Sequence, residues 1–241
     1  MKRRQFITSA AAAGLGGIAL SGCSARRHAA PYTGPGFDVH PFVKAHPEAV
    51  FVARTSIPSK KDTQRIHDTA YSLANELIVR TESGGYSPHT KILCKPNWTC
   101  NSPVDGKSAF DQRGINTDMH FVEGFLKAVR TKGPEEVFIR ECACPQHWQI
   151  HGWTQMAERN NFDMRDLSSL DYWDLKEGRD IRFVKVTDGT FFKEVGFQAP
   201  TTGNDTFLLN IAKFKAHGMG ITATVKNLQG LAGRKFHQYC T

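Results

Sequence analysis

The stretch from Thr206 to Gly230, TFLLNIAKFKAHGMGITATVKNLQG, indicates the fold more clearly than any other part of the sequence. It opens with an apolar run from Phe207 to Ile211, which is typical of a β-strand buried on both faces. Two glycines follow this run, and apolar residues then recur at helical spacing. A strand, a turn and a helix in this order predict an α/β domain with a largely parallel sheet.

Basic residues follow the strand at alternate positions. Lys213, Lys215 and His217 are separated by single apolar residues, so an extended backbone would place all three side chains on one face. A row of this kind suits a site for a small anion. It also suits an ordinary solvated strand end, and the spacing alone leaves both interpretations open.

The turn and the helix after it add backbone donors to this row. Gly218 and Gly220 permit a tight turn with accessible N–H groups. Thr222 is in position to cap the helix, and Lys226 follows on the same helical face. Because helix N-termini carry unpaired N–H groups and partial positive charge, the segment predicts an anion site.

The same stretch resembles the core signature of the domain-of-unknown-function 362 (DUF362) family. That signature has an Asn, spaced basic residues, a Gly/Thr-rich turn and a Lys-Asn pair. The matching positions are Asn210, Ile211, Lys213, Lys215, His217, Thr222, Lys226, Asn227, Leu228 and Gly230, with Lys95-Pro96-Asn97 and Thr117-Asp118 upstream. The resemblance covers about residues 50–230 and implies an α/β domain, but no established chemistry. It also implies more chain beyond the signature, so we expect the domain to be truncated at its C-terminus.

Segments with apolar residues at strand spacing alternate with segments at helical spacing along residues 48–241, which we expect to form a single domain. The expected fold is a mostly parallel sheet with helices on both faces. The expected strands are 50–53, 91–94, 136–140, 162–167 and 207–211, and a hairpin is expected in 182–197. The expected helices are 62–79, 117–129 and 151–159, the second of them capped by Thr117.

Polar side chains follow several of these strands directly. Ligands of parallel α/β sheets bind beyond the carboxyl ends of the strands, so these side chains are candidates for one site. We expect acid–base roles for His217, Lys215 and Lys95, since the pKa of His is near neutrality and clustered ammonium groups lower one another's pKa. The expected ligand contacts are Asn97, Glu141, Lys213, Gly218, Gly220, Thr222, Lys226 and Asn227. The residues name no reaction, so the sequence leaves open whether the chain is an enzyme.

Four cysteines support an alternative function. Cys94 and Cys100 follow one expected strand, and Cys142 and Cys144 follow another. Four thiols at one sheet edge would hold zinc or an iron–sulfur cluster, and the chain would then be a metal or redox protein. Disulfides or separate buried thiols fit the same spacing. The cofactor therefore stays unknown at this point.

The N-terminus predicts export. Residues 1–22 resemble a twin-arginine signal peptide with Arg3 and Arg4 as the arginine pair, and Cys23 follows as the residue of a lipoprotein processing box. Residues 23–47 are then expected to be a lipidated tether. The expected partners are the twin-arginine export machinery and a membrane, and the expected location is periplasmic or cell-surface. A non-catalytic binding lipoprotein is a further alternative.

The charge of the chain excludes one class of partner. The formal net charge is +8, and without Lys2, Arg3 and Arg4 it becomes 28 basic against 23 acidic residues, or +5. No dense basic block interleaved with aromatic residues is present, which disfavours nucleic-acid binding.

Overall fold

The computed structural model describes residues 32–99, 114–142, 147–165, 167, 174–217 and 220–233, without the side chains of residues 217, 220 and 222. These residues lie in one compact unit, 31–241. Within them, no helix has the length and apolar character needed to cross a membrane.

A four-stranded, all-parallel sheet forms the centre of this unit, with its strands in the order β5-β4-β3-β8. Its strands are β3 (Lys91–Pro96), β4 (Val137–Ile139), β5 (Asp163–Met164) and β8 (Thr206–Ile211). The α/β class predicted from the sequence is therefore confirmed. The two-residue β5 is much shorter than the strand expected at 162–167.

The position of residues 207–211 in the sheet differs from the prediction. The apolar run at 207–211 was expected to be buried on both faces, but β8 is the last strand of the sheet and Leu208 is 39% exposed. β3 is an inner strand, with Ile92, Leu93 and Cys94 fully buried. An apolar run fits a partly covered edge strand as well as a central one, which explains the error.

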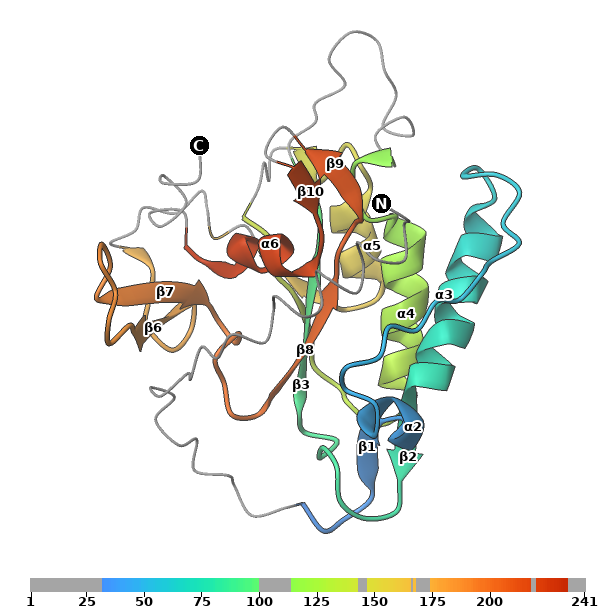
Figure 1. The fold of residues 1–241 in the computed structure, drawn as a ribbon, viewed down its shortest axis with the longest axis horizontal. Helices are drawn as coiled ribbons and strands as arrows, with labels where there is room; N and C mark the ends of the chain where they lie inside the picture. The colour runs from blue at the N-terminus through green and yellow to red at the C-terminus, as the bar shows by residue number, and fades with distance from the viewer. Residues whose placement is uncertain are drawn as a thin grey trace, which may run out of the picture. The chain divides into compact units, whose positions relative to one another are not determined.

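Helices α3 (Thr63–Leu77) and α4 (Met119–Arg130) pack against each other, as Figure 1 shows. Both match the predicted amphipathic helices, and Asp62 caps α3 by accepting a hydrogen bond from the backbone N–H of Arg65. The two helices approach closely at Gly124, where a Cβ atom would lie 2.2 Å from the backbone oxygen of His67. Glycine is therefore required at this helix–helix contact.

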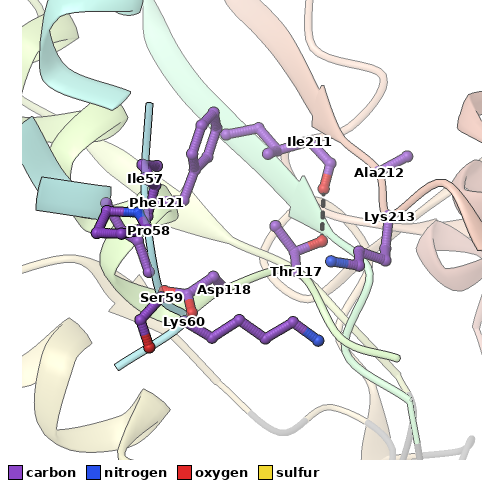
Figure 2. A pocket seen from close by; sticks show the side chains of 11 residues that line it. Ile57, Pro58, Ser59, Lys60, Thr117, Asp118, Phe121, Ile211, Ala212 and Lys213 are labelled. Atoms are coloured by element: carbon purple, nitrogen blue, oxygen red, sulfur yellow. Dashed lines mark hydrogen bonds between the residues drawn. The ribbon is translucent and has the colours of Figure 1, made fainter. Parts of the chain in front are cut away.

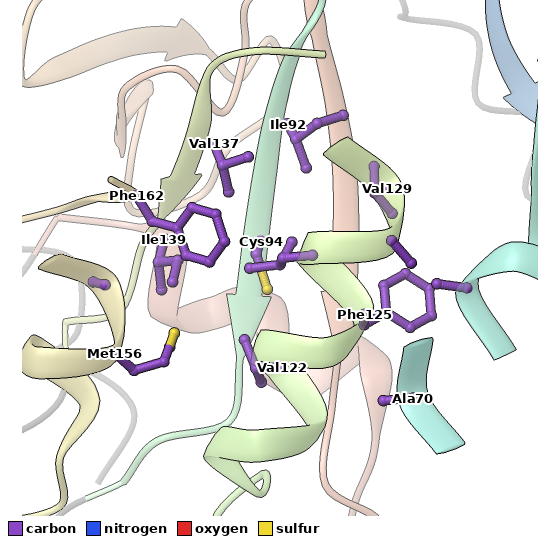
Figure 3. Close-up of a cluster of buried hydrophobic side chains, with 14 of the residues drawn as sticks. Ala70, Ile92, Cys94, Val122, Phe125, Val129, Val137, Ile139, Met156 and Phe162 are labelled. Atoms are coloured by element: carbon purple, nitrogen blue, oxygen red, sulfur yellow. The ribbon is translucent and has the colours of Figure 1, made fainter. Parts of the chain in front are cut away.

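The helices lie on both faces of the sheet, as predicted. Successive side chains of a strand point to opposite faces. Cys94 joins the apolar cluster that α4 contributes to (Figure 3), whereas the next residue, Lys95, contacts Asn227 of α6 (Thr224–Leu228). The 3₁₀ helix η5 (Gln229–Leu231) extends α6, and α5 (Trp153–Arg159) joins the apolar core through Trp153.

Three antiparallel strand pairs complete the described residues. They are β1 (Gly36–Val39) with β2 (Ile78–Thr81), β6 (Ile181–Lys185) with β7 (Glu194–Gln198), and β9 (Lys215–His217) with β10 (Gly220–Thr222). The β6–β7 pair is the hairpin expected in 182–197. A hydrogen bond links the chain after β7 to the chain after β4: fully buried Arg140 donates to the backbone oxygen of Ala199 at 2.7 Å.

The N-terminal part of the domain corrects two expectations. No strand forms at 50–53, where Val50 and Val52 are 87% and 88% exposed. Instead β1 pairs with β2, and the short helix α2 (Pro41–Lys44) follows β1. β1 and α2 both lie within residues 23–47, which were expected to be a tether. A short apolar run forms a strand only where a second strand pairs with it. Here β1 has such a partner in β2, and Phe37 of β1 is fully buried. The signal peptide and the lipid attachment remain predictions.

Candidate functional site

Lys95 lies at the carboxyl end of β3 and is almost completely buried, with 1% of its surface exposed. Its ammonium group donates to three acceptors: the backbone oxygen of Pro96 at 2.6 Å, Glu141 Oε2 at 2.6 Å and Asn227 Oδ1 at 3.2 Å. An ammonium group has three N–H donors, so all of them are used within the protein. This arrangement holds Lys95 in place and leaves it no donor for a ligand.

Glu141 follows β4 and is the counter-ion of Lys95. It is 3% exposed, and both of its carboxylate oxygens accept hydrogen bonds from backbone N–H groups. Oε2 accepts from Trp98 at 3.1 Å, and Oε1 accepts from Cys142 at 3.0 Å. The buried pair thus joins the chain after β3 to the chain after β4.

Asn227 of α6 connects the third strand to this pair. Its Nδ2 donates to the backbone oxygen of Lys95 at 3.0 Å and to Asn210 Oδ1 in β8 at 2.8 Å. Its Oδ1 also accepts from Asn97 Nδ2 at 2.9 Å. Four predicted site residues, Lys95, Asn97, Glu141 and Asn227, therefore form one buried polar network.

Thr117 extends the network to the N-terminus of α4. Its hydroxyl accepts from the backbone N–H of Asn97 at 3.0 Å and donates to the backbone oxygen of Ile211 at 2.8 Å. Thr117 was expected to cap this helix, but Asp118 does so through the N–H of His120. The hydroxyl of Thr117 is engaged between two strand ends, so the next residue supplies the cap.

Gly230 covers the buried pair from the side of η5. A Cβ atom on Gly230 would lie 2.5 Å from Glu141 Oε1 and 2.6 Å from Cε of Lys95. Such distances are shorter than van der Waals contact, so only glycine fits here. The family-like glycine after the Lys-Asn pair thus has a steric reason.

Lys215 of β9 is electrostatically coupled to this network but is itself half-buried. Its ammonium group donates to the backbone oxygen of Ile115 at 2.8 Å. Burial and the nearby charge of Lys226 lower the pKa of Lys215 from 10.5 to about 8, with Lys213 and Lys95 acting in the same direction and Glu141 opposing them. Positive charge therefore outweighs negative charge around Lys215.

Two buried side-chain amides have unused atoms. Asn97 Oδ1 and Asn116 Nδ2 are buried and have no hydrogen-bond partner among the residues that the structure describes. Asn116 directly follows the residue that Lys215 contacts, and its Oδ1 accepts from the backbone N–H of Thr99 at 2.9 Å. Unpaired buried polar atoms are uncommon, so these two are candidates for ligand contact.

Lys213 lies in a separate pocket of about 490 Å³ between the end of β8, the start of α4 and the segment 57–60 (Figure 2). Burial and the positive charge of Lys60 lower the pKa of Lys213, and Asp118 partly opposes this effect. The alternation of 213, 215 and 217 therefore does not produce one row of equivalent groups. Lys213 faces this pocket, while Lys215 contacts Ile115.

The structure describes some of the predicted residues not at all and others only in their backbone. Gly218, Cys100, Cys144, Cys23, Arg3 and Arg4 lie outside the described residues, and only the backbone of His217, Gly220 and Thr222 is described. Thr222 does not cap a helix as expected, because it pairs with Lys215 in the β9–β10 ladder. α6 begins two residues later and has no side-chain cap.

The two described thiols of the proposed metal site have different surroundings. Cys94 lies in the apolar core, and burial raises the pKa of its thiol to about 12, which disfavours the thiolate that metals bind. Cys142 is half-buried beyond β4. Within the described ranges no group of three or more His, Cys, Asp or Glu side chains could hold a metal ion. A centre that uses all four thiols stays an untested prediction.

Sequence reasoning overlooked Lys60, Asn116 and the steric role of Gly230. Lys60 belongs to an irregular segment, where no periodicity points to a site. Asn116 directly precedes the matched Thr117, and Gly230 ends the family-like signature, so position beside a motif was the available signal.

Comparison with known proteins agrees with this geometry. The model of the family described as domain of unknown function (DUF362) matches residues 92–241, which include all of β3 except Lys91, β4, β8 and the whole buried network. No curated protein and no solved structure matches the chain. Because the family model covers more than half of the sequence, the chain belongs to the DUF362 family.

Proposed function

We propose that this protein binds a small anionic ligand at the carboxyl edge of β3 and β8, with Lys215 and Lys226 as the main charged contacts. The observation that carries the proposal is the excess of positive charge at Lys215. Three other lysines act on this group, and Glu141 is the carboxylate that opposes them. A bound anion would offset this repulsion, because an opposite charge at short range favours the ammonium form.

Lys95, Glu141 and Asn227 support this site without contacting the ligand. Lys95, Glu141 and Asn227 hold the ends of β3 and β4 against α6 and thereby position Lys226 in that helix. Asn116, whose Nδ2 has no hydrogen-bond partner among the described residues, directly follows Ile115, to which Lys215 donates. A rigid support with a half-buried cation above it is the arrangement expected of a preorganised anion site.

Titration calorimetry of the full chain with inorganic phosphate and with citrate tests this proposal. We expect Lys215→Ala and Lys226→Ala each to weaken binding about tenfold or more, since a charge-assisted hydrogen bond contributes roughly 1.5–3 kcal/mol. Lys185→Ala is the matched control, because Lys185 is exposed on β6. If both site variants bind these anions as tightly as the control does, the proposal is wrong.

A catalytic role has its own test. A lysine with a pKa of about 8 is partly unprotonated near neutral pH, as proton transfer requires. Turnover of phosphorylated and carboxylated metabolites that is lost in Lys215→Ala would establish an enzyme. Binding without turnover would establish a binding protein.

We further propose that the chain is exported and anchored by a lipid on Cys23. The support is the order of basic, apolar and processing-box residues within 1–23. Replacing Arg3 and Arg4 by Lys should block transport, and Cys23→Ala should release the exported protein from the membrane fraction. Membrane attachment that persists in the Cys23→Ala protein would contradict the lipid anchor.

A further inference from the structure

The pocket that contains Lys213 differs in character from the site around Lys215. Its volume is about 490 Å³, within the range of roughly 300–1,000 Å³ that is typical of small-molecule sites. It opens between three separate parts of the chain, namely the segment 57–60, the N-terminus of α4 and the end of β8. The anion proposed above contacts none of the described residues that line this pocket. Lys213 takes part in that proposal only through the effect of its positive charge on Lys215.

The apolar lining gathers at one end of this pocket. Figure 2 shows Ile57, Pro58 and Phe121 together, away from the side-chain nitrogens of the two lysines. Ile57 and Phe121 are half-buried, so part of their apolar surface faces the pocket. Apolar surface of this kind is stabilised when an apolar group removes it from water.

The charged lining gathers at the other end. The ammonium groups of Lys60 and Lys213 both approach the side of the pocket near Thr117 (Figure 2). They are close enough for Lys60 to lower the pKa of Lys213, and Asp118 is the carboxylate that acts against this. Among the described residues that line the pocket, Lys60 and Lys213 contribute two ammonium groups and Asp118 one carboxylate, a net charge that suits a monoanion.

We propose that this pocket binds an amphiphilic monoanion, such as a medium-chain carboxylate, with its acid group at Lys60 and Lys213 and its alkyl chain against Ile57, Pro58 and Phe121. The proposal goes beyond the function proposed above and shares with it only the positive charge of Lys213. The pocket uses neither Lys215 nor Lys226, so the two proposals can fail separately.

A ligand series measured by calorimetry on the full chain tests the ligand class. The probes are butanoate, octanoate and octanol. Octanoate should bind at least about tenfold more tightly than butanoate, because each buried methylene contributes about fourfold in affinity. Octanoate should also bind about tenfold more tightly than octanol, since octanol lacks the charge that the two lysines would contact.

Two variants separate the charged end from the apolar end. Lys213→Met should weaken octanoate binding about tenfold and leave octanol binding unchanged, because it removes a charge and keeps the aliphatic stem. Ile57→Ala should weaken binding of both eight-carbon probes about fivefold through loss of apolar contact. The matched controls are Lys185→Met and Ile150→Ala, since Lys185 is exposed and Ile150 is 54% exposed away from the pocket.

The outcomes are distinguishable. Equal affinity for butanoate and octanoate, or unchanged octanoate binding in both Lys213→Met and Ile57→Ala, overturns the pocket proposal. Phosphate binding that still depends on Lys215 would then show that the anion site survives. Octanoate binding that is lost only in Lys226→Ala would place the ligand at the other site and likewise overturn the proposal. Circular dichroism melting curves for each variant identify any loss that comes from unfolding.

Discussion

Lys95 and Lys215 belong to the same sheet edge and to the same family-like motif set, yet they occupy opposite environments. Lys95 is 1% exposed and gives all three N–H donors to acceptors within the protein. Lys215 is half-buried, donates to one described acceptor and has other lysines as its main electrostatic neighbours. The first is therefore suited to holding strands together, and the second to binding an anion.

This difference teaches that a basic residue at the end of a parallel strand has two distinct uses. A buried lysine with a paired carboxylate fixes the arrangement of the elements, because leaving either charge alone in the interior is costly. A partly exposed lysine without a carboxylate partner retains unsatisfied charge. The first predictions below test the support, and the later ones test the open site.

The largest effect is expected for Glu141→Ala. This change leaves the buried ammonium of Lys95 without its counter-ion and removes the acceptor for two backbone N–H groups. We expect the free energy of unfolding to fall by about 3–5 kcal/mol, as for other broken buried pairs. Urea denaturation measures this loss. The double variant Lys95→Met/Glu141→Leu should lose less than the two single changes together, and a loss of under about 1 kcal/mol in Glu141→Ala would contradict the structural role.

Gly230→Ala should have the next largest effect. The added methyl group would meet Glu141 Oε1 at 2.5 Å, so η5 or the buried pair has to move. Overpacking of this kind costs about 1–3 kcal/mol. Gly114→Ala is the control, because its nearest contact would be Nζ of Lys60 at 3.6 Å. Equal melting temperatures for the two variants would show that Gly230 is not sterically required.

Lys215→Met should change stability very little. Lys215 is half-buried and makes one described hydrogen bond, to a backbone oxygen. We expect the free energy of unfolding at pH 7 to stay the same or to rise slightly, because the change removes a charge that the folded state disfavours. Urea denaturation at pH 7 checks this, with Lys95→Met as the contrasting variant. A Lys215→Met protein as unstable as Lys95→Met would remove the distinction between the two lysines.

The smallest expected effect is a dependence on pH. The folded-state pKa of Lys215 is about 8, below the ordinary lysine value of 10.5, so the unfolded chain binds more protons between these values. Where the unfolded state binds more protons, stability rises with pH. The charge of Lys215 should therefore lower the free energy of unfolding by its full amount below pH 8. This effect should decrease as the pH rises towards 10.5.

The stability difference between wild type and Lys215→Met, followed across this range by urea denaturation, measures that contribution. The free energy of unfolding of the wild type should increase relative to that of the variant as the pH rises. Added phosphate should shift the gain to higher pH, because a bound anion favours the ammonium form. A constant difference from pH 7 to pH 10.5 would show that Lys215 titrates as an ordinary exposed lysine.

The main elements could be predicted from the sequence because their signals are local. The apolar faces of α3 and α4 repeat at helical spacing, and the runs in β3 and β8 are continuous. Such patterns depend only on neighbouring residues. They do not say which strand lies at the edge, and the sequence accordingly placed 207–211 in the centre of the sheet.

Elements that depend on a distant partner could not be predicted in this way. β1 forms because β2, some forty residues later, supplies its partner, whereas the more apolar residues 50–53 have none. The cap of α4 passed from Thr117 to Asp118 because the end of β8 engages the Thr117 hydroxyl. In each case a long-range contact overrides a local preference.

The sequence by itself determined the α/β class and the presence of basic and amide residues after the strands. Parallel strands present their carboxyl ends at one edge, so the meeting of Lys95, Asn97 and Glu141 follows from that class. Only the tertiary structure decided the role of each lysine. Asn227 and Gly230, far along the chain, close over Lys95 and exclude it from solvent, while no described carboxylate forms a comparable pair with Lys215. Burial and pairing are properties of the folded chain, and they determine whether a lysine supports the fold or is available to a ligand.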